Sequence, residues 1–185
     1  MKNIWFNSFD LQLLNTRAGQ IDAINTATRA RSKKFAQNKT EFQLHYEGQM
    51  GEFAVAKYCG LEREYMHKPV HAGGDNGIDM VINGYRCHIK STTRSPAIAF
   101  VTNMDAFTAP VGIFTFINSP VSVCILGMVG RDKFERCCYT RDFGYGDRLA
   151  IQQRDLTDIS VLFDTGSGDT QPLLVSAEST QTQHT

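Results

Sequence analysis

The sequence predicts a mixed α/β fold, in which helices flank a sheet, and three observations support this prediction. Helical periodicity fills the chain from about residue 11 to residue 58. From residue 78 onward, short apolar runs alternate with turn residues, which is typical of strands. The 185 residues are 42% hydrophobic, which is enough to build one domain with its own core. Helices followed by strands around one apolar face therefore indicate a single α/β or α+β domain.

We expect residues 1–163 to form this domain, with a helical N-terminal segment at 1–40 and the core at 41–163. Residues 164–185 are rich in Gly, Ser, Thr and Gln, so we expect a flexible, acidic and polar tail. The formal net charge is zero but unevenly spread: residues 1–154 hold 19 basic and 14 acidic residues, and five acidic residues follow. A mildly basic body permits binding to nucleic acid and does not require it.

The sequence favours a cytoplasmic protein with no membrane partner. Its first residues, MKNIWFNSFD, lack the charged start and long apolar stretch of an export signal. The longest apolar run, VSVCILGMVG, is too short to cross a bilayer. The five cysteines are odd in number and lack CxxC spacing, which favours reduced thiols over a disulfide framework or a zinc site.

Two helices are expected before the strands. The first covers about residues 11–39, and its C-terminal part carries a basic cluster that includes Lys33 and Lys34. Such a cluster is either a solvated helix face or a surface that contacts phosphates. The second helix covers residues 41–58. Gly60 is placed to end it, because glycine readily adopts the left-handed conformation of a helix C-cap.

After the helices, the pattern predicts extended segments with one short helix among them. Residues 64–71 look extended. Strands are expected at 78–82, 85–91, 112–118 and 121–129, the short helix at 131–138, and a last strand or extended segment at 148–156.

The stretch GIDMVINGYRCHIKST, residues 77–92, predicts a hairpin with a defined register. Asn83-Gly84 favours a two-residue type I′ turn, because both residues tolerate a positive φ. That turn sets Asp79 opposite His88, and it sets a glycine opposite Lys90, which leaves open space beside the ammonium. Alternation gives an apolar face of Met80, Ile82, Tyr85, Cys87 and Ile89, and a polar face of Asp79, Val81, Arg86, His88 and Lys90.

These residues resemble the PD-(D/E)XK nuclease superfamily, whose motif is an acid on one strand, a tight turn, and acid-x-Lys on the next strand. Here the pieces are Asp79 and His88-Ile89-Lys90. The upstream GQMGEFAVAKYCGL resembles a helix that carries a Glu in many members, here Glu52, and CILGMVGRDKF resembles the strand and helix that follow in small members. The resemblance covers residues 41–136 and implies a restriction-endonuclease-like fold, a mixed sheet flanked by helices.

The resemblance also implies an activity, that of a metal-dependent nuclease that hydrolyses DNA phosphodiester bonds with Mg²⁺ or Mn²⁺. Asp79, Glu52 and the backbone carbonyl of Ile89 would hold the ion. Lys90 would orient the attacking water or stabilise the negative charge that develops on the phosphate.

Other residues near the motif are candidates for contact with nucleic acid. Arg86 shares the polar face, and Ser91 and Thr92 follow the lysine with hydroxyls that can donate to phosphate. Lys33 and Lys34 belong to the basic cluster described above. A homodimer would suit an enzyme that cuts both strands of a duplex.

The departure from the family pattern is His88, where members usually have Asp or Glu. Imidazole suits softer ions better than Mg²⁺, and it removes one negative charge from the site. His88 would be a metal ligand that favours Mn²⁺, or a general base while Asp79 and Glu52 hold one ion. In the remaining alternative, the protein is a catalytically attenuated or inactive nuclease-like module that binds nucleic acid or a protein partner.

Overall fold

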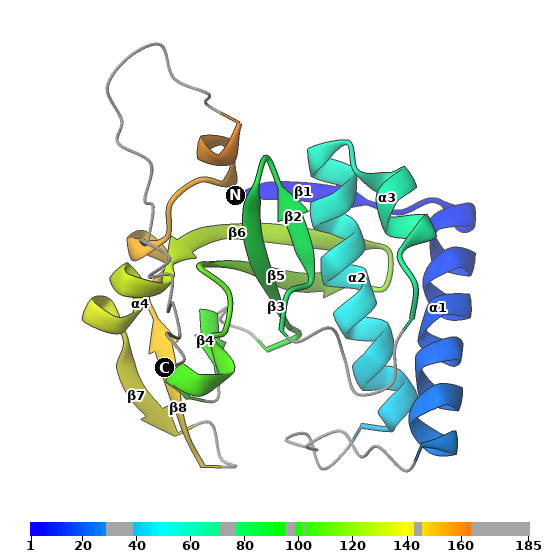
Figure 1. The fold of residues 1–185 in the computed structure, drawn as a ribbon, viewed down its shortest axis with the longest axis horizontal. Helices are drawn as coiled ribbons and strands as arrows, with labels where there is room; N and C mark the ends of the chain where they lie inside the picture. Colours follow the sequence, from blue (N-terminus) through cyan, green and yellow to red (C-terminus); the bar gives the residue numbers. More distant parts are fainter. Residues whose placement is uncertain (29–38, 71–76, 95–98, 102, 143–145, 164–185) are drawn as a thin grey trace, which may run out of the picture.

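The computed structural model describes residues 1–28, 39–70, 77–94, 99–101, 103–142 and 146–163, over which the chain is a mixed α/β fold (Figure 1). The helices are α1 (Ser8–Ala27), α2 (Glu41–Cys59), α3 (Glu62–His67) and α4 (Arg131–Cys137). The strands are β1 (Lys2–Trp5), β2 (Met80–Ile82), β3 (Tyr85–Thr92), β4 (Ala99–Val101), β5 (Val111–Ser119), β6 (Ser122–Gly130), β7 (Tyr139–Asp142) and β8 (Asp147–Ile151). Short 3₁₀ turns are η1 (Met104–Ala106), η2 (Gln153–Asp155) and η3 (Ile159–Leu162).

Within the described residues, the strands form a mixed sheet of five and an antiparallel sheet of three. The larger sheet has the order β1-β6-β5-β3-β2, and β3 runs parallel to β5 while the other neighbours are antiparallel. The smaller sheet has the order β4-β8-β7. A mixed sheet flanked by helices confirms the predicted α/β class at this level.

Each face of the larger sheet packs against a different layer. Ile89 and Ile113, register partners on β3 and β5, pack with Val55 of α2. On the opposite face, Phe114 belongs to a core that includes Val101 of β4. Figure 1 shows α2 against the hairpin of β2 and β3, and α1 beside α2, while α4 and the smaller sheet lie at the other end. Strand β5 therefore contributes to two cores, through Ile113 on one face and Phe114 on the other.

Helix α2 begins and ends where its sequence predicts. The Thr40 hydroxyl accepts the N–H of Gln43 at 3.1 Å, and the Gln43 side chain accepts the N–H of Thr40 at 2.9 Å, a reciprocal cap. Gly60 ends the helix in the left-handed region, with φ of 69°.

A glycine in the middle of α2 brings the helix close to the sheet. A Cβ atom added to Gly51 would lie 1.9 Å from Ser91 Oγ and 2.7 Å from Thr115 Oγ1. Real Cβ atoms do not approach other atoms so closely, so glycine is required for this packing. The residue that follows Gly51 is Glu52, so the same contact sets the depth at which the Glu52 backbone sits over β3.

The prediction of extended structure at 64–71 was wrong for its first part, because Glu62–His67 form α3. The reason is a tertiary contact. Tyr65 is buried, with its ring centroid 5.1 Å from that of Phe53 on α2, and this contact holds the segment as a helical turn against α2.

Other boundaries also differ from the prediction. Helix α1 starts at Ser8, three residues before the expected start, because Asn7 and Asp10 form a capping box. Strands β1, β4 and β7 were not predicted; each is three or four residues long and too short for a clear alternation. The basic cluster at 29–34 and the tail at 164–185 lie outside the described residues.

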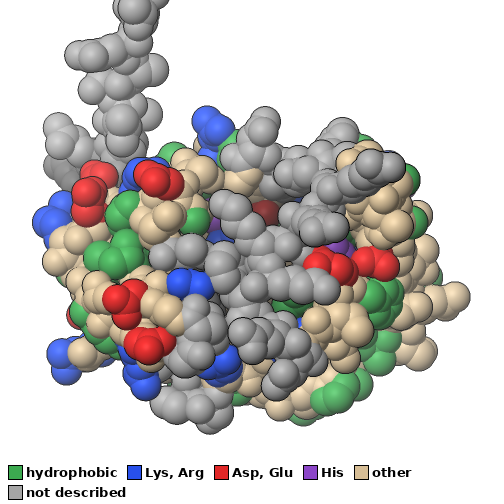
Figure 2. Space-filling view, turned by 90° about the horizontal axis from the view of Figure 1, so that it is seen from below, with side chains coloured by type: hydrophobic (Ala, Val, Ile, Leu, Met, Phe, Trp, Pro, Cys, Tyr) green, Lys and Arg blue, Asp and Glu red, His purple; other side chains and the backbone are tan. Residues whose placement is uncertain are grey.

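Two surface properties bear on function. In the view of Figure 2, basic and acidic side chains are interspersed over the described part of the surface. None of the described helices is long and apolar enough to cross a membrane.

Candidate functional site

The hairpin has the predicted register. Met80 pairs with Cys87, Val81 with Arg86 and Ile82 with Tyr85. The turn uses the positive φ values expected of it, 47° at Asn83 and 84° at Gly84. Of the predicted apolar face, Ile82, Cys87 and Ile89 are buried and Met80 packs against them, whereas Tyr85, beside the turn, is exposed.

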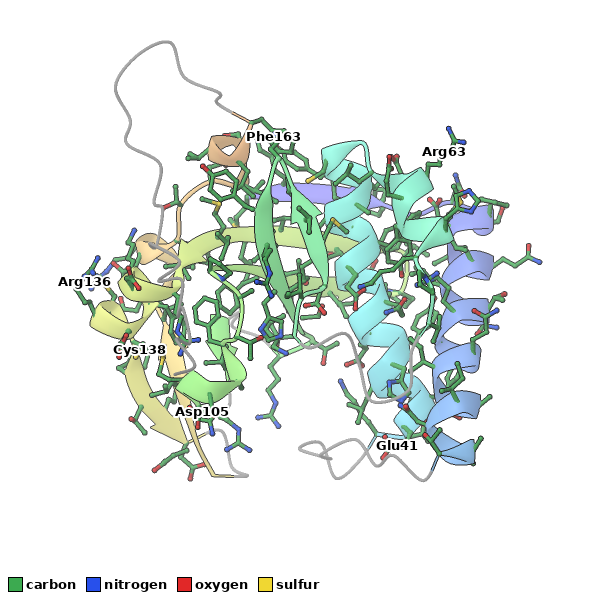
Figure 3. All side chains as sticks on the ribbon, in the orientation of Figure 1. Glu41, Arg63, Asp105, Arg136, Cys138 and Phe163 are labelled. Carbon is green, nitrogen blue, oxygen red and sulfur yellow. The ribbon has the colours of Figure 1, made fainter. Side chains whose placement is uncertain are left out.

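The hairpin tip is fastened to the end of the described chain. The Asn83 side chain donates a hydrogen bond to the carbonyl of Leu162 at 2.9 Å. Figure 3 shows Phe163 beside this tip, and its ring lies edge-on to Tyr58 of α2, with ring centroids 6.1 Å apart. The turn is therefore held from outside the hairpin as well as by its own sequence.

Asp79 and His88 lie together at the other end of the hairpin, as predicted. Asp79 Oδ2 is 3.8 Å from His88 Nε2 and accepts the N–H of Ile89 at 2.5 Å. The Asp79 N–H donates to the carbonyl of Cys87 at 2.9 Å. In a regular continuation of the ladder, a backbone carbonyl of the opposite strand would accept the Ile89 N–H. Here the Asp79 carboxylate accepts it instead, and this bond fixes the carboxylate against β3.

His88 is buried, which excludes a solvent-facing position for this part of the polar face. Its side chain is 7% exposed, and its Nδ1 atom is buried. Its register partner on β5 is Gly112, where a Cβ atom would come within 2.7 Å of the Phe107 ring. The absence of a side chain at Gly112 thus leaves room for the Phe107 ring at the position of β5 that pairs with His88.

Lys90 lies two residues after His88 on the same face of β3, as alternation requires, and is half-buried. The expected open space opposite it is a misprediction. Strand β2 begins at Met80, so Gly77 lies outside the ladder. A Cβ atom on Gly77 would lie 2.0 Å from Thr108 Oγ1, and the Thr108 hydroxyl donates to the Gly77 carbonyl at 3.0 Å.

Glu52 is connected to Asp79 by a residue that sequence reasoning missed, Lys68. The Lys68 Nζ donates to the backbone carbonyl of Asp79 at 2.7 Å and lies 3.9 Å from Glu52 Oε2. Lys68 follows α3 with no motif around it, and only the tertiary fold brings it to the hairpin. The lysine therefore joins the Glu52 helix to the Asp79 strand.

A buried polar cluster supports Glu52 and Lys68. Gln49 donates to Glu52 Oε1 at 3.1 Å and accepts from Arg17 Nε at 3.1 Å. Arg17 Nη1 also donates to the Lys68 carbonyl at 3.1 Å, and the Arg17 guanidinium lies 4.6 Å from the Tyr65 ring centroid. Burial, followed by the negative charge of Glu52, raises the pKa of Tyr65. The hydroxyl therefore stays protonated and donates to Gln49 Oε1 at 2.6 Å.

The residues expected to contact nucleic acid differ in their exposure to solvent. Arg86 is exposed. Ser91 faces α2 and is bonded to Thr115 Oγ1 at 3.0 Å, and Thr92 is buried and accepts the N–H of Arg94 at 3.1 Å. Both hydroxyls thus serve contacts inside the fold. Lys33 and Lys34 lie outside the described residues.

Asp79 and His88 form a close pair of potential metal ligands. Among the residues that the structure describes, no three His, Cys, Asp or Glu side chains come together as a set for a metal ion. Ile89, expected to offer its carbonyl, contributes its N–H to Asp79. Comparison of the chain with protein-family models, curated proteins and solved structures gives no match.

Proposed function

We propose that the protein is a metal-dependent nuclease of the PD-(D/E)XK type that hydrolyses DNA phosphodiester bonds. The observation that carries this proposal is the pair formed by Asp79 and His88, 3.8 Å apart, with Lys90 two residues further along the same strand face. A carboxylate, an imidazole and an ammonium on one hairpin form a group suited to a phosphate and its counter-ion.

The pair fits a divalent ion as two of its ligands. Asp79 offers an oxygen and His88 a nitrogen, and the remaining positions suit water and phosphate oxygens, as Mg²⁺ and Mn²⁺ sites commonly use. When bound, such an ion polarises the phosphate and lowers the pKa of a coordinated water. The imidazole favours Mn²⁺ over Mg²⁺, because Mg²⁺ prefers oxygen ligands. Glu52 lies outside the pair and would act on the ion through water.

The protein's own groups supply the rest of the chemistry. Asp79 is held by the Ile89 N–H, so its carboxylate is oriented before a substrate arrives. The Lys90 ammonium would stabilise the charge that develops on the phosphate oxygens. Arg86, exposed on the same strand, would contact a neighbouring phosphate.

The restriction-endonuclease-like fold and the choice of DNA are parts of the same proposal. The mixed sheet, the hairpin in register and a helix with a central Glu packed on that hairpin support this fold. A homodimer, which would place two sites on a duplex, fits cleavage of double-stranded DNA.

A second candidate is supported by His88. With an imidazole in place of a second carboxylate, the pair carries one negative charge fewer than two acids would, so its attraction for a cation is weaker. The protein would then be an attenuated nuclease-like module that binds nucleic acid or a protein partner without cutting.

A cleavage assay tests the first candidate. Purified protein is incubated with single- and double-stranded DNA in Mg²⁺ or Mn²⁺, beside Asp79→Ala, Lys90→Ala and the control Asp105→Asn. We expect cleavage by the wild type and the control and a large loss in the two site variants. Equal cleavage by every variant, or none by any, contradicts nuclease activity.

A further inference from the structure

The ammonium of Lys68 occupies a position between the two acidic residues of the candidate site. It donates to the Asp79 carbonyl at 2.7 Å and lies 3.9 Å from Glu52 Oε2. The Glu52 side chain is 16% exposed and that of Lys68 is 27% exposed, so the pair is shielded in part from solvent. At this distance and burial, the lysine neutralises much of the charge of Glu52.

Lys68 and Glu52 are held by the same buried cluster. Arg17, 6% exposed, donates to the Lys68 carbonyl, and Gln49, also 6% exposed, donates to Glu52 Oε1. Arg17 and Gln49 are themselves bonded at 3.1 Å. One cluster therefore fixes the backbone of the lysine and the carboxylate of the glutamate, so the ammonium–carboxylate pair is built into the fold.

An ammonium at Glu52 has a consequence for metal binding. A divalent ion close to this carboxylate would have to displace Lys68 or sit beside its positive charge. The Asp79 side chain faces His88, whereas Lys68 donates to the backbone carbonyl of Asp79. The pair and the lysine therefore use different groups of Asp79.

We propose that Lys68 is an internal cation that neutralises Glu52 and limits the site to one divalent ion, at Asp79 and His88. Lys68 is in this role a positioning residue, which acts through Glu52. The inference rests on the proposed function for the presence of the ion. Beyond that function, it states how many ions bind and which residue limits their number.

Direct measurement of Mn²⁺ binding tests the inference without any reaction. Isothermal titration calorimetry is performed on the wild type, Lys68→Met, Lys68→Gln and Lys68→Arg, with folding checked by thermal unfolding. The wild type is expected to bind one Mn²⁺. Loss of the positive charge in Lys68→Met should tighten Mn²⁺ binding about tenfold or add a second ion. Lys68→Arg should match the wild type.

Lys68→Gln protects the test against a folding defect, because its amide is neutral and still able to donate. The double variant Lys68→Met/Glu52→Gln should lose the gain, since the exposed charge of Glu52 is its source. Equal or weaker Mn²⁺ binding in both neutral variants overturns the inference, as does a gain that persists in the double variant. So does a complete absence of binding. If the wild type binds one Mn²⁺ and the neutral variants bind it more tightly, the inference is upheld. If DNA is not cleaved in the same conditions, the proposed nuclease activity is contradicted.

Discussion

Asp79 Oδ2 lies 3.8 Å from His88 Nε2 and 2.5 Å from the N–H of Ile89. One carboxylate oxygen thus faces an imidazole and the backbone of the same neighbouring strand. A side chain bound in this way has lost most of its rotamer freedom on folding, so little further entropy is spent when it meets a ligand. The predictions below test this pair and the packing that holds it.

Binding of Mn²⁺ to this pair should stabilise the folded protein. A ligand that binds the folded state raises the melting temperature as its concentration exceeds its dissociation constant. We expect a Mn²⁺-dependent rise in the wild type, reversed by EDTA, and none in Asp79→Asn. Differential scanning fluorimetry measures both. The exposed Asp105→Asn is the control, and an equal rise in all three proteins would place the ion elsewhere.

Replacing His88 with an acid should strengthen the proposed metal site. His88→Asp places a second carboxylate in a buried position near Asp79, so without metal we expect a loss of about 1–3 kcal/mol of stability. Mg²⁺ should recover this loss, and Mg²⁺-dependent cleavage should rise relative to the wild type. Chemical denaturation with and without Mg²⁺ and the cleavage assay check the two effects. Loss of stability without recovery by Mg²⁺ would show that the position is not a metal site.

Two glycines of α2 form a matched pair for a packing test. Gly51→Ala forces a methyl group against Ser91 Oγ and Thr115 Oγ1, and we expect a loss of about 1–3 kcal/mol. Gly48→Ala meets nothing within 4 Å and should stabilise the helix by about 0.5–1 kcal/mol. Urea denaturation measures both. Effects of the same sign at the two positions would contradict the close contact between α2 and β3.

The hairpin tip can be tested at Asn83 with two substitutions. Asn83→Gly removes the side chain and its hydrogen bond to the Leu162 carbonyl but tolerates the positive φ, with an expected loss of about 0.5–1.5 kcal/mol. Asn83→Ala also strains the backbone at a φ of 47° and should lose about 1–2 kcal/mol more. Denaturation of both variants separates the two contributions. If Ala is tolerated as well as Gly, the left-handed turn is not required.

The different exposure of the thiols predicts a defined labelling pattern. Burial raises the pKa of Cys59 and of Cys87 to about 12, so both remain protonated near neutral pH and should react slowly with iodoacetamide. The exposed Cys137 should react first. Peptide mass spectrometry of a labelling time course at pH 8 measures the order of reaction. Because unfolded thiols ionise at lower pH than these folded ones, stability should fall as pH rises from about 9 toward 12. Early labelling of Cys87 would contradict the packing of β3.

Local features of this fold could be predicted from the sequence, because short-range chemistry decides them. Asn83-Gly84 selects one turn, the turn selects one register, and the register brings Asp79 beside His88. Gly60 likewise marks the end of α2. Each inference spans only a few residues, where backbone geometry allows few alternatives.

Long-range features could not be predicted in this way. Lys68 reaches Asp79 and Glu52 only because α3 forms, and α3 forms because Tyr65 packs on α2. His88 pairs with Gly112 of β5, whose missing side chain makes room for the Phe107 ring, and neither residue has a periodic relation to the hairpin. Such contacts arise from tertiary packing, and neither hydrophobic periodicity nor local propensity predicts them.

The alternation of β3 gives the candidate site neighbours on both faces of the sheet. Ile89 and Ser91 lie on the face that packs against α2, while His88 lies on the other face, where it pairs with Gly112 of β5. A substitution that alters the packing on one face of β3 would displace only the side chains on that face. The distance between the Asp79 carboxylate and the His88 imidazole is therefore sensitive to the packing on either face of this one strand.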